Sequence, residues 1–265
     1  MIIDIHAHVF PDEIAERAVK MLAERSDGIA FADGTCAGLL ASMQKAGIDR
    51  SAIMPIATKP SQVESINRWM LEIREKYPEF ICFAALHPAR ECWKADIERI
   101  AADGFPGVKL HPDYQEFFVD DPQYIPMYKA LADHGLILLF HAGDDVGLPP
   151  PVHCTPDRLA RVLDAVPEIT IIAAHMGGYL CWDDVYRYLV GRNLYFDTSY
   201  SLQDLGAEPM TALMKAHGIE RILFGTDSPW TDQASSVREI RDMNLTESEI
   251  VAVLGGNSEK LLGLR

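Results

Sequence analysis

The sequence lacks several features that define whole classes of protein. Its five cysteines (Cys36, Cys82, Cys92, Cys154 and Cys181) are odd in number and form no C-x-x-C pair, so they are interpreted as free thiols of a cytoplasmic protein. No apolar stretch approaches the roughly 18 residues that a membrane span requires. Residues 1–9 already have the pattern of a strand, and we therefore expect no signal peptide.

Basic charge is also scarce. The chain has 24 lysines and arginines against 39 aspartates and glutamates, which gives a formal net charge of −15. A nucleic-acid partner would require a basic face, so we expect neither a nucleic acid nor a membrane as partner. We expect a small-molecule substrate instead. A carboxylate remains among the candidates, because a few local cations can outweigh the overall charge. A homodimer is a further possible assembly.

A glycine-rich phosphate turn after the first strand is missing too, which disfavours an open, doubly wound sheet. Eight apolar runs occupy residues 1–9, 51–57, 80–86, 107–111, 136–141, 169–175, 194–199 and 221–227. Helical patterns lie between them at residues 65–77, 93–102, 124–133, 156–166, 179–189 and 209–217. We predict one α/β domain over residues 1–265, folded as a (β/α)8 TIM barrel. Residues 11–35 form a longer first excursion that could cover its mouth.

The first apolar run contains a His-x-His pair. Because side chains alternate along a strand, we expect Asp4, His6 and His8 to point the same way. Two imidazoles side by side in a buried strand are costly as bare polar groups, and a bound metal removes that cost. The pair alone is equally typical of two hydrogen-bonded histidines in a core.

Later runs end in further ionisable side chains. His141, His175 and Asp227 each close an apolar run and are followed within two residues by Gly or Pro, which are typical of a tight exit turn. Lys109 and His111 share a face at the end of the fourth run. In a parallel barrel the carboxyl ends of the strands meet at one face, so these groups predict a single site.

These residues resemble the amidohydrolase superfamily and, within it, the amidohydrolase-2 branch. That branch contains metal-dependent hydrolases and decarboxylases similar to aminocarboxymuconate-semialdehyde decarboxylase. The resemblance covers the whole chain and rests on the segments DIHAH at 4–8, GVKLHP at 107–112, FHAG at 140–143, AHMGG at 174–178, GTDSP at 225–229 and the closing residues 255–264.

The resemblance implies a role for each matching residue. The implied metal ligands are His6, His8, His141 and Asp227. They would hold one divalent ion, zinc or alternatively manganese. His175 would be the catalytic acid or base, and Asp227 would take a proton from water activated by the metal. Lys109 has two readings: a cation for the substrate, which we favour, or a carboxylated lysine that bridges two metals.

The implied chemistry leaves two main functions open. The first is a metal-dependent hydrolase that uses metal-activated water on an amide, lactone or similar carbonyl compound. The alternative is a non-oxidative decarboxylase, a carboxy-lyase for an unsaturated or aromatic acid. A TatD-type nuclease, which residues 226–229 also resemble, is disfavoured by the acidic charge. We expect Lys109, His111 and Trp230 to bind substrate. Lys59 and Arg90 are further candidate carboxylate contacts, but we favour a solvated surface charge for each of them.

Overall fold

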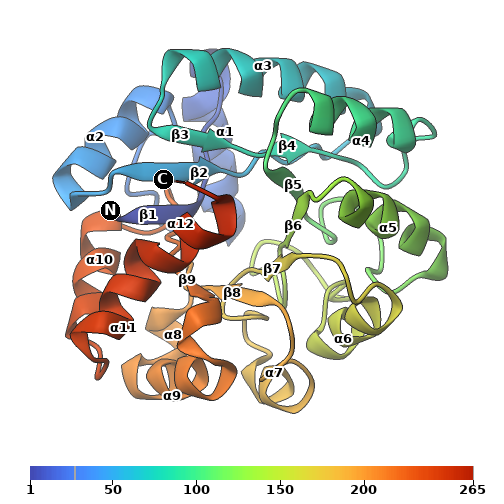
Figure 1. Ribbon diagram of the computed structural model, residues 1–265. Coiled ribbons are helices and arrows are strands. Elements are labelled where there is room, and N and C mark those ends of the chain that lie inside the picture. Colours follow the sequence, from blue (N-terminus) through green and yellow to red (C-terminus); the bar gives the residue numbers. More distant parts are fainter. Residues whose placement is uncertain (27, 265) are drawn as a thin grey trace.

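The computed structural model describes residues 1–26 and 28–264 and shows parallel strands surrounded by helices (Figure 1). The strands are β1 (Ile3–Ala7), β2 (Arg50–Ile53), β3 (Phe80–Cys82), β4 (Ala84–Ala85), β5 (Gly107–Leu110), β6 (Ile137–Phe140), β7 (Ile171–Ala173), β8 (Tyr195–Asp197) and β9 (Ile222–Leu223). Every strand pair is parallel. The predicted TIM-barrel fold is confirmed.

Helices follow the strands and form the outer layer. They are α1 (Asp12–Ser26), α2 (Cys36–Ala46), η1 (Pro60–Gln62), α3 (Val63–Lys76), α4 (Trp93–Ala102), η2 (Pro122–Tyr124), α5 (Ile125–Asp133), α6 (Pro156–Ala165), α7 (Trp182–Tyr188), α8 (Leu202–Leu205), α9 (Ala207–His217), η3 (Ile219–Arg221), α10 (Gln233–Asp242), α11 (Glu247–Val251), η4 (Ala252–Gly256) and α12 (Asn257–Leu262). Among the described residues, no helix is both long and apolar enough to cross a membrane.

The strands are assigned to two sheets, β1-β2-β3 and β4-β5-β6-β7-β8-β9. Backbone hydrogen bonds also join the last strand to the first. Ile5 N–H donates to Phe224 O at 2.8 Å, and Asp227 N–H donates to His6 O at 2.7 Å. These hydrogen bonds connect the last strand to the first, and we call this contact the β9–β1 seam. At the seam His6 and Asp227 lie side by side, although they are far apart in the sequence.

Two local predictions are wrong. The run at 80–86 is not one strand, because the buried Phe83 interrupts it and donates its N–H to Ile53 O at 3.1 Å. Asp4 does not share a face with the two histidines, because the register shifts between Asp4 and Ala7. Such an irregularity turns the following side chains. Asp4 instead accepts hydrogen bonds from Thr226 Oγ1 at 2.6 Å and Gln233 Nε2 at 2.7 Å.

Apolar side chains from the strands support the site from below. One buried cluster combines residues from most of the strands with Phe83: Ile5, Ala52, Met54, Phe83, Ile137, Leu139, Ile172, Ala174 and Leu223. A second and larger cluster fills the space between the strands and the helices. The excursion at 11–35 contains α1, whose Met21 and Leu22 line the cavity at the mouth. Residue 27 of this excursion lies outside the described residues.

Candidate metal centre

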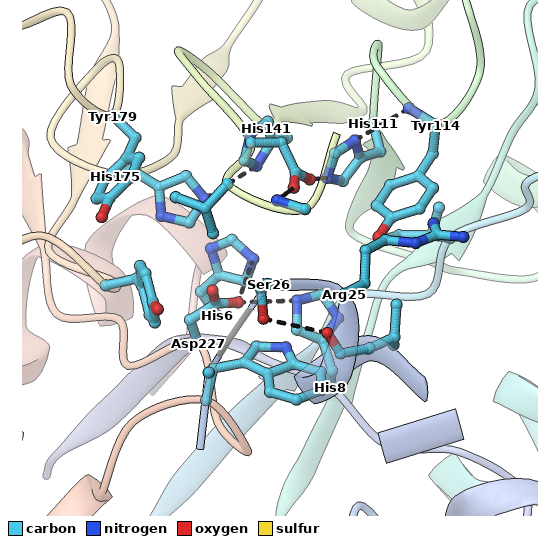
Figure 2. A pocket seen from close by; sticks show the side chains of 18 of the residues that line it. His6, His8, Arg25, Ser26, His111, Tyr114, His141, His175, Tyr179 and Asp227 are labelled. Atoms are coloured by element: carbon cyan, nitrogen blue, oxygen red, sulfur yellow. Dashed lines mark hydrogen bonds and ion pairs between the residues drawn. The ribbon is translucent and has the colours of Figure 1, made fainter. Parts of the chain in front are cut away.

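Three side chains from the two ends of the sequence meet at the β9–β1 seam (Figure 2). His8 Nε2 lies 3.0 Å from Asp227 Oδ1, and His6 Nε2 lies 3.5 Å from the same oxygen. Asp227 has a φ of 63°, which a non-glycine residue adopts rarely and which turns the chain sharply after β9. The three ligand atoms lie within 4.8 Å of one another, a spacing that one metal ion can bridge.

The hydrogen bonds of the two imidazoles show where their protons lie. His6 Nδ1 is 2.8 Å from Asp197 Oδ2, and His8 Nδ1 is 2.8 Å from the backbone oxygen of Met54. Both partners only accept, so both Nδ1 atoms carry the proton. In the neutral rings the Nε2 lone pairs then face the Asp227 carboxylate. Three acceptors that converge in this way repel one another unless a cation lies between them.

The charge states support this fit. Burial lowers the pKa of His6 to about 4, so its ring is neutral near pH 7. Burial alone would raise the pKa of Asp227, but the neighbouring His6 and His8 more than offset it and hold that pKa below its usual value. Two histidine side chains and one carboxylate are a donor set that suits zinc or manganese.

Lys109 reaches into the same group from β5. Its side chain is 1% exposed, and its Nζ lies 3.2 Å from His6 Nε2, to which it can donate a hydrogen bond. Burial lowers the pKa of Lys109 to about 8. The amine therefore remains largely a cation near pH 7, directly beside the nitrogen that would bind a metal.

A second group of two histidines and one aspartate lies across the cavity. The rings of His111 and His141 are stacked with centroids 4.1 Å apart, and His111 Nε2 is 3.2 Å from Asp145 Oδ2. The compact group at the seam consists of His6, His8 and Asp227, whereas His141 groups with His111 and Asp145. The structure thus brings three of the four predicted ligands into one compact group. The ligand role of His141 stays a prediction.

His175 connects the two groups. It follows β7 with a φ of 58°, its Nδ1 lies 3.0 Å from Ser199 O, and its Nε2 lies 3.0 Å from His141 Nδ1. Its ring centroid is 5.4 Å from that of His6. The 3.0 Å between His175 Nε2 and His141 Nδ1 is a hydrogen-bonding distance, so a proton can pass between the two rings. This arrangement suits proton transfer at the edge of the candidate metal site.

These groups lie in a cavity of about 530 Å³. Its walls include the aromatic side chains Phe10, Tyr114, Tyr179, Tyr200 and Trp230. The predicted substrate residues Lys109, His111 and Trp230 all line it. A cavity of this size and lining accommodates a small planar molecule.

The other predicted cations are placed differently. Lys59 lines the cavity. Arg90 does not, because its guanidinium binds Asp96 at 2.6 Å and Glu64 at 2.9 Å. Arg90 is thus held in ion pairs and is not among the residues that line the cavity. Arg25, which sequence reasoning missed, lines the cavity from α1 and lies 5.9 Å from the centre of the Tyr114 ring. A basic residue in the last turn of a helix is common, so the sequence alone does not indicate that Arg25 lines the cavity.

A parallel barrel with histidines and an aspartate at the carboxyl ends of its strands defines a class of metal-dependent barrel enzymes. Within that class the chain belongs to the Amidohydro_2 family, described as amidohydrolase, whose sequence model matches residues 3–264. The predicted family is thereby confirmed. None of the curated proteins that were searched matches the chain.

Several solved structures share the fold. An uncharacterised TIM-barrel protein from Bordetella bronchiseptica is 20% identical with a TM-score of 0.79, covering 99% of this chain and 98% of the other. A 2,6-dihydroxybenzoate decarboxylase in complex with 2,6-dihydroxybenzoate is 17% identical with a TM-score of 0.77, covering 99% of both chains. A 5-carboxyvanillate decarboxylase from Novosphingobium aromaticivorans, in complex with manganese and a nitrobenzoic acid, is 17% identical with a TM-score of 0.77, covering 100% and 96%.

Proposed function

We propose that this protein is a metal-dependent carboxy-lyase that removes carbon dioxide from a small aromatic or unsaturated carboxylic acid. The observation that carries the proposal is the buried Lys109 ammonium. In the described part of the chain its Nζ hydrogen-bonds only to His6 Nε2, at the base of a cavity with aromatic walls. A buried cation without a bonded carboxylate provides a place for an anionic group of a ligand.

The metal-binding residues are proposed to be His6, His8 and Asp227, with His141 as a fourth ligand. The ion, zinc or manganese, would supply a Lewis acid for the substrate oxygens. Structures that share the fold include decarboxylases named for aromatic acids, one of them with manganese. These similarities support the carboxy-lyase and leave the choice of metal open.

The side chains have distinct tasks in this reaction. Lys109 orients the acid, and the aromatic walls hold its plane. His175 delivers a proton to the carbon that carries the carboxylate. The bond from that carbon to the carboxylate then breaks, carbon dioxide leaves, and the electron pair of the bond returns to the remaining conjugated system. The proton takes the place of the lost group, so no oxidant or reductant is needed.

Hydrolysis of an amide or lactone is the second candidate, and Asp227 favours it. This carboxylate stays ionised beside the two imidazoles and could take a proton from an attacking water. Both functions need one Lewis acid and one proton-transfer group. Both also keep the earlier expectations of a cytoplasmic enzyme with a small-molecule partner and the option of a homodimer.

Metal analysis followed by a substrate panel distinguishes the two candidates. The panel contains hydroxybenzoic acids, dienoic acids, lactones and amides, each with the zinc-loaded and the manganese-loaded protein. We expect metal-dependent release of carbon dioxide from an acid, and the same protein stripped of metal is the control. Cleavage of lactones or amides without carbon dioxide from any acid would replace the carboxy-lyase by the hydrolase.

A further inference from the structure

Asp197, the last residue of β8, is fully buried and is bonded through both carboxylate oxygens. Its Oδ2 accepts from His6 Nδ1 at 2.8 Å. Its Oδ1 accepts the backbone N–H groups of His175 at 3.0 Å and of Ser199 at 3.1 Å, and also the Ser199 hydroxyl. Four donors therefore converge on the two oxygens, and a group that only accepts in this way is a carboxylate.

Ser199 extends this contact to a second imidazole. Its Oγ lies 3.1 Å from His6 Nδ1 and 3.0 Å from His175 Nδ1. Because the hydroxyl hydrogen points to Asp197, the oxygen lone pairs face the two rings. The backbone oxygen of Ser199 lies 3.0 Å from His175 Nδ1 as well. Both groups facing that nitrogen accept, so His175 Nδ1 carries a proton and the neutral ring has a bare Nε2.

We propose that Asp197 and Ser199 form one positioning unit that sets the tautomers of two histidines with different tasks. Asp197 keeps the His6 proton on Nδ1, which leaves Nε2 bare toward Asp227. Ser199 does the same for His175, whose Nε2 is thereby left to exchange a proton. Outer partners of this kind fix the ring and its tautomer at metal sites. The inference rests on the proposed ligand role of His6.

Substitution by asparagine separates this role from mere packing. In Asp197→Asn the Oδ1 position must still accept two backbone N–H groups, so the amide oxygen stays there and the amide nitrogen faces His6. An amide nitrogen donates, and it would therefore favour the His6 tautomer with a bare Nδ1 and the proton on Nε2. A proton on Nε2 blocks binding of a metal, although the shape of the side chain is unchanged.

Asp113 offers a matched control. Its Oδ1 accepts from His153 Nδ1 at 2.8 Å and from the backbone N–H of His153 at 3.0 Å. This pair has the same chemistry as Asp197 with His6, but it does not line the cavity. Asp113→Asn should therefore show how much zinc affinity changes when a buried aspartate–histidine pair is weakened away from the cavity.

The experiment measures zinc affinity by competition with a chelator and the imidazole tautomers by nitrogen-15 spectra of the metal-free protein. We expect Asp197→Asn to weaken zinc binding about ten- to a hundredfold, while Asp113→Asn and Ser199→Ala stay within about twofold of the parent. The spectra should show Nδ1-protonated His6 and His175 in the parent and Nε2-protonated His6 in Asp197→Asn.

Equal zinc affinity in Asp197→Asn and Asp113→Asn, or an unchanged His6 tautomer, would overturn the role of Asp197. If Asp197→Asn fails to fold, the parent spectrum alone decides, because Nε2-protonated His6 there contradicts the proposal. Ser199→Ala keeps the backbone oxygen that also faces His175 Nδ1, so we expect both histidines to stay Nδ1-protonated in this variant, and an Nε2-protonated His175 in the parent overturns the role of Ser199. Lack of metal binding in the parent would contradict the proposed function instead. The spectra of the metal-free protein would still test the two tautomers, because they do not depend on metal binding.

Discussion

Two groups of two histidines and one aspartate face the same cavity, and they differ in where their protons lie. At the β9–β1 seam, Asp197 and Met54 O accept the Nδ1 protons, which directs the Nε2 lone pairs of His6 and His8 toward Asp227. Across the cavity, the Tyr114 N–H lies 3.4 Å from His111 Nδ1, which directs the His111 proton from Nε2 to Asp145.

Residue types alone therefore do not define a metal site. In the second group, His111 has a donor beside one ring nitrogen and an acceptor beside the other, so this ring is satisfied without an ion. The first group has acceptors facing acceptors, so it gains from a cation. Only the hydrogen-bonding partners behind the rings distinguish the two groups. Metal content and turnover of matched variants test whether the two groups differ in this way.

The largest effect is expected from His6→Ala. Removing one of three converging ligands should lower metal affinity by more than about a hundredfold, which exceeds the loss for an outer partner. Turnover should disappear with the metal. The measurement is elemental analysis after gel filtration. His111→Ala is the matched control, a buried histidine of the other group, and it should keep its metal to within about threefold.

His141→Ala is informative alongside that pair because His141 is the predicted fourth ligand. We expect it to lose metal as His6→Ala does. Retention of metal at the level of His111→Ala would restrict the ligand set to His6, His8 and Asp227. Equal loss of metal in His6→Ala, His141→Ala and His111→Ala would show that the two groups act as one site. It would contradict the claim that only the seam group needs a cation.

A smaller effect is expected from His175→Asn. The variant should keep its metal but lose about a hundred- to ten-thousandfold in kcat, since proton transfer contributes a factor of this size. Elemental analysis and steady-state kinetics on the same sample separate the two quantities. His217→Asn is a suitable control, because His217 is also buried but bonds to Leu194 O outside the cavity. It should lose stability and keep its kcat. A metal-free His175→Asn would make His175 a ligand.

Lys109→Met should act on substrate binding. Losing one charge-assisted contact should raise KM for anionic substrates by about ten- to a hundredfold and change it little for neutral ones. Lys59 also lines the cavity but is exposed, so water screens its charge, and Lys59→Met should change KM by no more than about twofold. Equal damage to anionic and neutral substrates would assign Lys109 to the metal group or to the barrel core.

The pH dependence of KM tests the same contact without a substitution. Because the pKa of Lys109 is lowered to about 8, its charge is present below that pH and is lost above it. A nearby metal ion would lower this pKa further. KM for an acid should therefore rise as pH increases through about 8 or below, and Lys109→Met should lack this rise. A flat profile in the parent protein would contradict the assignment.

Much of the site could be predicted because it depends on local pattern. Lys109 lies near the end of β5 and Asp227 follows β9, and the ends of parallel strands meet at one face of a barrel. The direction of Asp4 could not be predicted, because a register shift in β1 turns it toward Gln233. The partners of Arg90 could not be predicted either, since the ion pair with Glu64 depends on how distant helices pack.

The division of the histidines into two groups was also beyond the sequence. Simple alternation directs Lys109 and His111 into the cavity, and both do line it. It carries no information on the stacking of His111 against His141 or on the proton that His6 gives to Asp197. Such contacts join residues from different strands, and each depends on side-chain rotation rather than on residue type.

The smallest effect is expected from Asp145→Asn. An asparagine can still accept the His111 proton through its amide oxygen, so the second group stays satisfied. Metal affinity should change by less than about threefold, and the free energy of unfolding by about 0.5–1.5 kcal/mol, the worth of one weakened hydrogen bond. Chelator competition and urea unfolding measure the two quantities. A tenfold or larger loss of metal would mean that Asp145 is a ligand, and the second group would then hold a cation of its own.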